Sequence, residues 1–242
     1  MKFKEFLNKK SLPVLYTVFG RHSNPPHASA HLPALYTSFG GDRLNESVLP
    51  PRFLDSHEEE IHLKNSIKHH PSIKKYTDHS ADINNALRRH HEKQQIDDDI
   101  IEDIHSLDSV LDHAKTDRNL TLYTSLYESP VHYWTNGDKN GSTIVHLPAY
   151  TSTSTKYVQA RKFAKFDDSL DKTNKVKHLL KIDVPPKSKG GSVMSQSENP
   201  LEYEFLLHRG HNLRIDHKPE IKTDGTHIWS ATVLGHDPNV VN

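Results

Sequence analysis

The spacing of apolar residues follows a helical period between about 57 and 118 of this 242-residue chain. Glu58, Glu59 and Glu60 suit the first turn of a helix, because the helix dipole favours negative charge there. Ser80 can cap a helix whose apolar side carries Ile83, Ala86 and Leu87. A longer helix is predicted from apolar residues with 4-3-4-3 spacing, which form one stripe that packs on a core: Ile100, Ile104, Leu107, Leu111 and Ala114.

After Asn119 the apolar pattern becomes typical of strands. A polar loop over 136–141 has hairpin-turn chemistry, and a short helix is predicted over 156–166, with Ser154 or Thr155 as its cap. Because helices come first and strands later, the sequence predicts an α+β fold. The predicted strands cover 120–126, 144–147, 176–184, 205–207 and, closing the sheet, 228–234.

Residues 1–55 show no sustained periodicity and hold six prolines. Within them Leu15–Gly20 recurs as Leu35–Gly40, but two short copies do not make a solenoid. We therefore expect a weakly ordered N-terminal arm over 1–55 and one domain over 56–242. That domain divides into a helical lobe (56–118) and a sheet core (119–242).

Composition excludes several classes of protein. The 31 basic and 31 acidic residues balance, so no overall charge favours nucleic acid or a membrane surface. There is no cysteine, and the 20 histidines show no metal-ligand spacing, so no metal site is expected. No apolar run approaches the roughly 18 residues of a membrane span, and no secretory apolar region opens the chain. These features predict a soluble protein of intracellular type.

Two acids, Glu202 and Glu204, precede the apolar run Phe205–Leu207. Side chains alternate between the faces of a strand, so both carboxylates are predicted to share one face, roughly 6.6–7 Å apart. Like charges on one face repel each other and add nothing to packing. They suit a site where positive charge is held or develops; the alternative is an exposed strand end with two solvated acids.

Segments in a fixed order resemble the Arg-Ser-Glu class of mono-ADP-ribosyltransferases, found among bacterial toxins and phage enzymes. The resemblance covers roughly residues 70–235. It implies an ADP-ribosyltransferase-like split β-sandwich with an N-terminal helical lobe, and NAD as substrate without a metal. The segments are Tyr76–Arg88 for the helical lobe, the Leu-Tyr strand over 120–126, Tyr150–Ser154 leading into Ala160, Phe163 and Ala164, and Glu202–Leu207.

The resemblance also implies a role for each polar group. Breaking the nicotinamide–ribose bond leaves positive charge on the ribose, as in glycoside hydrolysis, and a fixed carboxylate stabilises that charge. Glu204 takes this role, Glu202 orients and partly deprotonates the acceptor, and Ser152 positions the catalytic carboxylate. In this class, Glu at the first place of the pair goes with guanidinium acceptors, so arginine on a target protein is expected.

The resemblance further implies which residues contact NAD and the target. Phe163 or Phe166 would stack on nicotinamide, with core packing as the alternative for Phe163. The loop over 188–201 occupies the target-recognition position. The expected NAD contacts are Tyr123, Thr124, Thr153, Ser154 and Phe163.

One position departs from the class. Its first motif places an arginine after the aromatic residue of the first strand, whereas here Thr124 follows Tyr123. A threonine donates one neutral hydrogen bond to a phosphate and cannot replace a bidentate, charge-assisted pair. The loss costs about 1.5–3 kcal/mol in NAD affinity. Candidate substitutes are Arg118, Lys156 and Arg161.

The opening Met1–Asn8 resembles the leader of proteins that large tailed phages package into their heads. Those leaders are cut after a Leu/Ile-x-Glu triplet, and Leu44-Asn45-Glu46 fits. The resemblance implies a virion protein delivered to the host cytoplasm. A host protein is the expected partner, and RNA carrying NAD at its end is the one nucleic-acid partner left open.

Four functions are compatible with these patterns. The favoured one is NAD-dependent transfer of ADP-ribose to a protein side chain. An NAD glycohydrolase would perform the same first step with water as acceptor. A non-catalytic binding module would keep the fold without NAD, and a virion structural protein would rest on the leader alone.

Overall fold

A computed structural model describes residues 56–91, 95–126, 129–130, 141–164, 166–167, 176–197 and 200–236. The predicted N-terminal arm, with its repeat, its leader and the Leu44-Asn45-Glu46 triplet, lies outside the described residues. Of the predicted loop over 136–141, only Gly141 is described.

Three helices form the first part of the described chain, as the apolar spacing predicts: α2 (Ser56–Lys64), α3 (Pro71–His91) and α4 (Asp98–Leu111). Helix α3 begins at Pro71, well before the predicted cap Ser80. Proline is favoured at the first helical position because the N–H it lacks has no partner there. Non-helical dihedral angles at His79 (φ −131°, ψ 30°) kink the helix, so Ser80 opens its second half instead.

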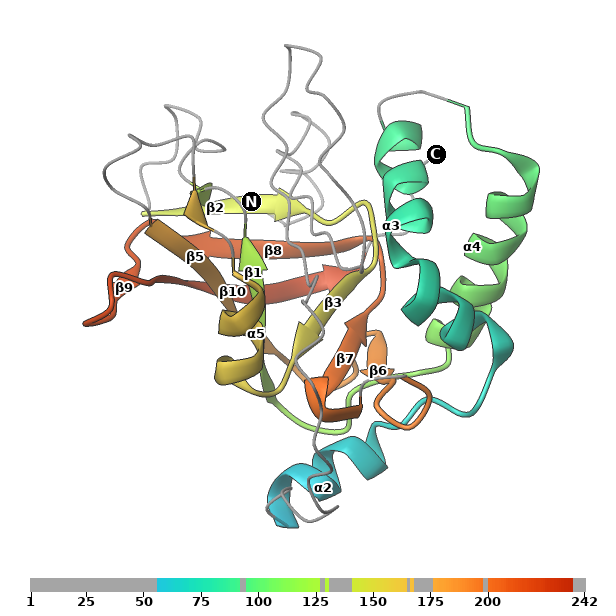
Figure 1. The fold of residues 1–242 in the computed structure, drawn as a ribbon, viewed down its shortest axis with the longest axis horizontal. Helices are drawn as coiled ribbons and strands as arrows, with labels where there is room; N and C mark the ends of the chain where they lie inside the picture. Colours follow the sequence, from blue (N-terminus) through green and yellow to red (C-terminus); the bar gives the residue numbers. More distant parts are fainter. Residues whose placement is uncertain are drawn as a thin grey trace, which may run out of the picture.

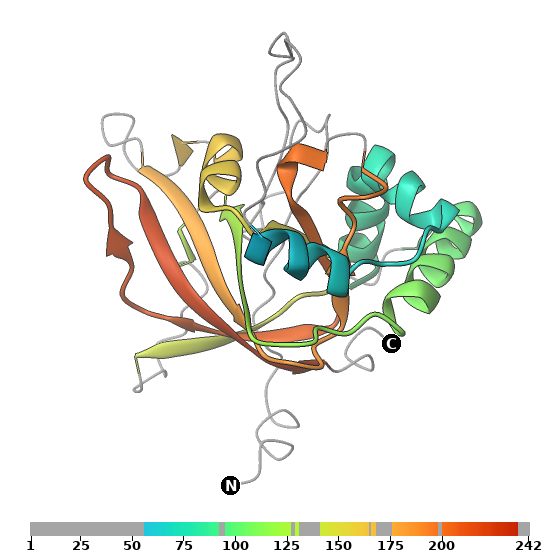
Figure 2. The same cartoon turned by 90° about the horizontal axis from the view of Figure 1, so that it is seen from below.

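Helices α3 and α4 pack against each other and form a lobe at one end of the molecule (Figure 2). Ile104, Leu107 and Leu111 of the predicted stripe are buried there. The same hydrophobic cluster includes Tyr150 and Leu206, which come from the sheet side of the chain. The lobe therefore packs against the part of the sheet that carries the predicted motifs.

The strands form one ten-stranded sheet in the order β2-β8-β10-β5-β1-β3-β7-β6, with β4 beside β5 and β9 beside β10 (Figure 1). The α+β class is confirmed. The strands are β1 (Leu120–Leu126), β2 (Ser142–His146), β3 (Thr151–Ser154), β4 (Phe166–Asp167), β5 (Val176–Val184), β6 (Gly190–Ser192), β7 (Glu204–Leu207), β8 (His211–Asp216), β9 (Glu220–Ile221) and β10 (His227–His236).

The last strand does not close the sheet, so that prediction is wrong. Strand β10 lies between β8 and β5 and pairs in parallel with β5. Its side chains Trp229, Ala231 and Val233 are buried in the main hydrophobic cluster. Alternate burial of this kind suits an interior strand, whatever its place in the sequence.

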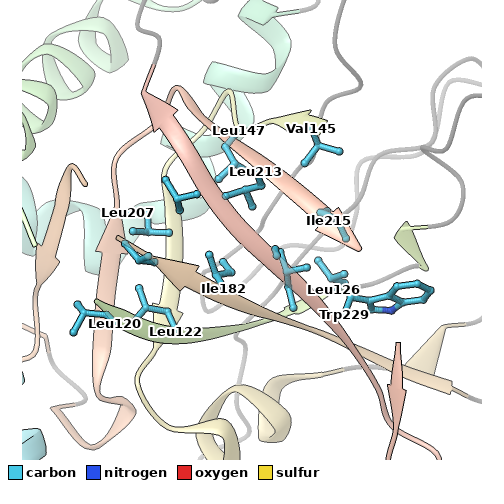
Figure 3. Close-up of a cluster of buried hydrophobic side chains, with 14 of the residues drawn as sticks. Leu120, Leu122, Leu126, Val145, Leu147, Ile182, Leu207, Leu213, Ile215 and Trp229 are labelled. Atoms are coloured by element: carbon cyan, nitrogen blue, oxygen red, sulfur yellow. The ribbon is translucent and has the colours of Figure 1, made fainter. Parts of the chain in front are cut away.

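The main hydrophobic core lies between the two halves of this twisted sheet. Figure 1 shows β8 and β10 running across the direction of β3 and β7. Their apolar side chains meet in one cluster, in which Leu207 of β7, Leu213 of β8 and Ile182 of β5 are all buried (Figure 3). Packing in this core fixes the position of β7, the strand that begins with Glu204.

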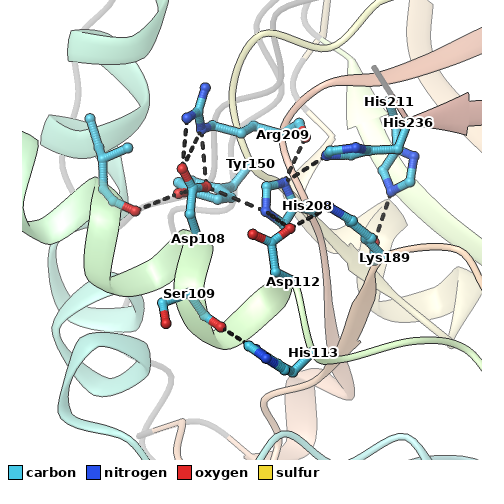
Figure 4. A network of polar contacts seen from close by, with 11 residues as sticks. Asp108, Ser109, Asp112, His113, Tyr150, Lys189, His208, Arg209, His211 and His236 are labelled. Carbon is cyan, nitrogen blue, oxygen red and sulfur yellow. Dashed lines mark hydrogen bonds and ion pairs between the residues drawn. The ribbon is translucent and has the colours of Figure 1, made fainter. Parts of the chain in front are cut away.

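A polar network ties the helical lobe to the turn after β7 (Figure 4). Asp108 of α4 accepts hydrogen bonds from Nε and Nη2 of Arg209, with a shortest distance of 2.6 Å. The Tyr150 hydroxyl also donates to Asp108, at 2.6 Å. A bidentate guanidinium–carboxylate pair is directional and strong, so this contact fixes how the lobe sits on the sheet.

Candidate active site

The predicted motifs meet where β3 pairs with β7. The strands are antiparallel, with Ser154 opposite Glu204. Opposite residues of such a pair project from the same face, and residues two apart on one strand also share a face. Ser152, Ser154 and Glu204 therefore lie on one face, and Tyr123 of β1, opposite Ser154, lies on it too.

Glu202 does not lie on the strand with Glu204, so the predicted same-strand geometry is wrong. Pro200–Glu202 forms a 3-10 turn, Tyr203 has a left-handed φ of 52°, and β7 begins only at Glu204. Proline fixes its own φ and favours such a turn, so the extended backbone of β7 starts only after Glu202 and Tyr203. Glu202 is half-buried, whereas Glu204 is 4% exposed.

The carboxyl group of Glu204 carries a strongly raised pKa of about 8. Burial raises the pKa most, a hydrogen bond from Ser152 lowers it, and the charge of nearby Glu202 raises it. The two acids thus still influence each other across the turn. Groups with such displaced pKa values are common at functional sites.

Ser152 is held from the side of the helical lobe. Its Oγ lies 3.3 Å from the hydroxyl of Tyr76, which in turn accepts a hydrogen bond from Nδ2 of Asn84 at 2.9 Å. Tyr76 and Asn84 are fully buried and Ser152 is nearly so. Burial raises the pKa of Tyr76 well above its usual value, so its hydroxyl keeps its proton.

The sequence prediction gave no role in the site to the polar residues of α3, and it treated Ser80 only as a helix cap. Tyr76, Ser80, Asn84 and Arg88 recur every four residues, and all four are buried. Residues four apart lie on one side of a helix. A polar stripe with this spacing, in a helix that packs on a core, was the signal in the sequence that could have identified them.

Thr124 and Thr153 project from the face opposite Glu204. Thr153 lies opposite Phe205 in the β3–β7 pair, and its hydroxyl donates to the Phe205 carbonyl at 2.6 Å. The Thr124 hydroxyl donates to the carbonyl of Ser152 at 3.1 Å. Both side chains are fully buried. In this structure these two predicted NAD contacts support the backbone under Ser152 and Glu204.

Ser154 links β3 to the turn that carries Glu202. Its hydroxyl donates to the Glu202 carbonyl at 2.7 Å and accepts from the Lys156 backbone N–H at 3.1 Å. Helix α5 (Tyr157–Phe163) starts after Lys156, and no side chain caps it. The predicted capping by Ser154 or Thr155 is therefore wrong, because both hydroxyls are used elsewhere.

His62 of α2 is another residue that the sequence prediction missed. Its Nδ1 lies 2.7 Å from Oγ of Ser192, and its Nε2 lies 3.1 Å from Oγ1 of Thr155. Burial, followed by the charge of Lys156, lowers its pKa to about 4, so the ring is neutral at pH 7. His62 joins the end of β3 to β6 beside Tyr203, whose ring centroid is 6.1 Å away.

Tyr123 of β1 and Phe163, the last residue of α5, belong to a small hydrophobic cluster around that helix. The rings of Tyr123 and Tyr157 pack edge to face with centroids 5.8 Å apart. Phe163 is half-buried and packs on the same small cluster as Ala160 and Leu179. Of Phe166, only the backbone is described, in β4. This packing corresponds to the alternative that the sequence left open for Phe163, core packing instead of stacking on nicotinamide.

The three cations proposed to replace the missing arginine have different surroundings. Arg118 contacts Glu60 and Asp117. Arg161 contacts Asp224. The Nζ of Lys156 lies 5.6 Å from the ring centroid of Tyr203, the residue between the two acids in the sequence.

The described residues contain neither a metal-binding cluster nor a membrane-spanning helix. No group of three or more histidines or acids in the described ranges is arranged to hold a metal ion. No helix in that part of the chain is long and apolar enough to cross a membrane.

Comparison with known proteins assigns the family. Residues 52–234 match the model of the ADP-ribosyltransferase exoenzyme family. The chain belongs to this family, and NAD is therefore the substrate from which ADP-ribose is transferred. No curated protein matches the sequence.

Solved structures share the fold at low sequence identity. An ADP-ribosyltransferase from Clostridium botulinum has a TM-score of 0.56 and 16% identity, covering 77% of this chain and 98% of that one. An ADP-ribosyltransferase toxin from Paenibacillus larvae has a TM-score of 0.56 and 20% identity, covering 74% and 94%. An S. aureus protein, solved with NAD, has a TM-score of 0.55 and 18% identity, covering 76% and 98%.

Proposed function

We propose that the protein transfers ADP-ribose from NAD to an arginine side chain of a target protein and releases nicotinamide. The observation that carries this proposal is the position of Glu204, buried on the serine-bearing face of β3 and β7 with Glu202 close enough to act on its charge. A buried carboxylate at this position can stabilise positive charge on a bound ribose far better than a solvated one.

The proposed step breaks the bond between the ribose C1′ and the nicotinamide nitrogen, and nicotinamide leaves with the electron pair. Glu204 stabilises the ribose cation that develops. A guanidinium nitrogen of the acceptor then attacks C1′, and its proton passes to Glu202. Glu202 is half-buried and lies on the turn before β7, so its carboxylate can meet an acceptor that arrives from solvent. A carboxylate also matches the two-donor geometry of arginine.

An exposed apolar side chain next to Glu202 favours contact with a target protein. Leu201 is apolar and 52% exposed, and it lies within the Pro200–Glu202 turn, at the end of the segment 188–201. We therefore assign target contact to this segment, in agreement with the position expected from the family resemblance.

For the NAD phosphates we propose Arg88 of α3 in place of the missing first-strand arginine. Arg88 is buried, and its charge acts on Tyr76, which contacts Ser152. It thus lies on the same side of the sheet as Glu204. Arg88→Ala is expected to raise the KM for NAD about ten-fold or more, in line with the loss of a charge-assisted pair to phosphate. Initial rates of nicotinamide release over a range of NAD concentrations measure this.

The function is tested by incubating the protein with labelled NAD and mixed host proteins. Label is expected on protein, and arginine is expected at the modified position by mass spectrometry. Glu204→Ala should abolish both labelling and nicotinamide release, because no group then stabilises the ribose cation. Glu202→Ala should abolish labelling but leave slow NAD hydrolysis, because only acceptor activation is lost.

Each remaining outcome points to a different function. Nicotinamide release without label on protein would assign NAD hydrolysis. If the wild-type protein neither released nicotinamide nor labelled protein, a binding or structural role would remain. Wild-type labelling by the Glu204→Ala variant would show that this carboxylate is not the catalytic one.

A further inference from the structure

Four buried polar side chains form a continuous chain from α3 to the candidate catalytic carboxylate. Nδ2 of Asn84 is 2.9 Å from the Tyr76 hydroxyl, which is 3.3 Å from Oγ of Ser152. The Ser152 side chain in turn acts on Glu204 as a hydrogen-bonding neighbour that lowers its pKa. Ser152 and Glu204 are diagonal neighbours on the shared face of β3 and β7, a separation that long side chains span.

The chain has a direction, which Asn84 sets. An amide nitrogen donates hydrogen bonds and does not accept them. Its proton occupies a lone pair of the Tyr76 oxygen, so the Tyr76 proton is available for Ser152. The Ser152 oxygen then accepts from Tyr76, and its own proton is directed at Glu204.

Asn84 is poorly explained as a scaffold residue. Asparagine is a weak helix former, and Oδ1 of Asn84 is buried without a hydrogen-bond partner among the described residues. An unpaired buried acceptor costs folding free energy. A polar residue kept in a fully buried helical position, at a cost to stability, is typical of a functional site.

We propose that Asn84 and Tyr76 are positioning residues that orient the Ser152 hydroxyl proton toward the carboxylate of Glu204. The assignment of Glu204 to the ribose cation rests on the proposed function; the hydrogen-bond chain itself does not. Orientation by buried groups needs no rearrangement when charge develops, which is how preorganised sites gain their effect. The helical lobe therefore favours the ionised form of Glu204 and partly offsets the effect of burial on its pKa.

The direct test is the pKa of Glu204 in the free protein, measured by NMR of carbon-13-labelled glutamate carboxyl groups, with Glu204→Gln identifying the signal. Tyr76→Phe keeps the ring and removes the hydroxyl. Because a hydrogen bond to the ionised form favours that form, the variant should raise the Glu204 pKa by about 0.5–1 unit. In a Ser152→Ala background, Tyr76→Phe should cause no further change, since its effect passes through Ser152.

Tyr150→Phe is the matched control. Tyr150 is also fully buried, and its ring packs edge to face on Tyr76 with centroids 5.6 Å apart. Its hydroxyl, however, donates to Asp108 and the Ile104 carbonyl. Loss of this hydroxyl should lower the melting temperature and leave the Glu204 pKa at its wild-type value.

Kinetics give the second readout. If the wild-type protein cleaves NAD, Tyr76→Phe should lower kcat/KM at pH 7 about three- to ten-fold and move the inflection of its pH profile upward, while KM changes little. An inactive wild type would overturn the proposed function, yet the NMR titration would still decide on the hydrogen-bond chain.

The inference is wrong if folded Tyr76→Phe keeps the wild-type Glu204 pKa, or if its effect is equally large without Ser152. Should Tyr76→Phe fail to fold, Asn84→Leu takes its place, because leucine is of similar size and removes the donor that sets the direction. An unchanged Glu204 pKa in Asn84→Leu would overturn the inference in the same way.

Discussion

At the scale of single residues, Glu204 is the unusual group. Ionised carboxylates are rarely buried unless paired, because the charge loses its hydration. Here the side chain is 4% exposed, and its pKa of about 8 means that most molecules hold a proton on it at pH 7. The proposed chemistry needs the ionised form, so this residue should set the pH dependence of both activity and stability.

The first expected consequence concerns the rate. For NAD cleavage, kcat/KM should rise about ten-fold per pH unit below pH 8 and level off above it, because it follows ionisation of Glu204 in the free enzyme. The kcat profile should inflect at lower pH, since the positive nicotinamide ring of bound NAD favours the carboxylate. Initial rates of nicotinamide release between pH 5 and 9 measure both. A flat profile across this range would contradict the assignment.

The second consequence concerns folding. The native state holds the Glu204 proton more tightly than the unfolded chain, whose pKa is near 4.5. Stability therefore falls as pH rises from about 4.5 to about 8. Glutamine has no proton to lose, so at pH 8.5 Glu204→Gln should be more stable than wild type by on the order of 5 kcal/mol and should unfold at a higher temperature. At pH 5 the variant and wild type should have similar melting temperatures. An equal difference in melting temperature at pH 5 and pH 8.5 would show that burial does not perturb the pKa of Glu204.

At the scale of elements, the turn that ends at Glu202 and the left-handed backbone at Tyr203 separate two acids that a continuous strand would place together. Tyr203 adopts a left-handed φ that non-glycine residues seldom take. Its carbonyl accepts from the Thr155 N–H at 3.3 Å, and Lys156 covers its ring. These contacts hold Glu204 inside and leave Glu202 partly exposed.

The lobe-to-sheet network gives a prediction at the same scale. Arg209→Lys removes the bidentate contact to Asp108 while keeping the charge. We expect the free energy of unfolding to fall by about 1.5–3 kcal/mol, which lowers the melting temperature by about 3–10 °C. Arg214→Lys, at an exposed position of β8, is the control and should melt like wild type. Equal melting temperatures for the two variants would mean that the network does not stabilise the lobe.

At the scale of the whole molecule, periodicity alone predicted the main elements. The stripe from Ile104 to Leu111 and the alternation from Val176 to Val184 appear as α4 and β5. The place of β10 inside the sheet could not be predicted, because strand order depends on long-range pairing that no local pattern records. The kink at His79 was missed because a proline start at Pro71 and Ser80 each fit a helix beginning on local rules.

The candidate site could also be predicted only in part, because some of its features depend on tertiary structure. Ser152 and Glu204 were identified as neighbours because short motifs carry them. The change of backbone at Tyr203 was missed, since an E-x-E pattern reads as a strand until its turn is seen. The contribution of Tyr76 and Asn84 needed the helix to be placed on the sheet, which sequence spacing alone does not supply.

The central claim is that the buried carboxylate of Glu204 stabilises the ribose cation of NAD. Single-turnover nicotinamide release, compared between wild type and Glu204→Gln at pH 8.5, tests it most directly. We expect the substitution to slow release at least about a hundred-fold while NAD binding, measured by calorimetry, changes little. Release by Glu204→Gln at the wild-type rate would contradict the claim.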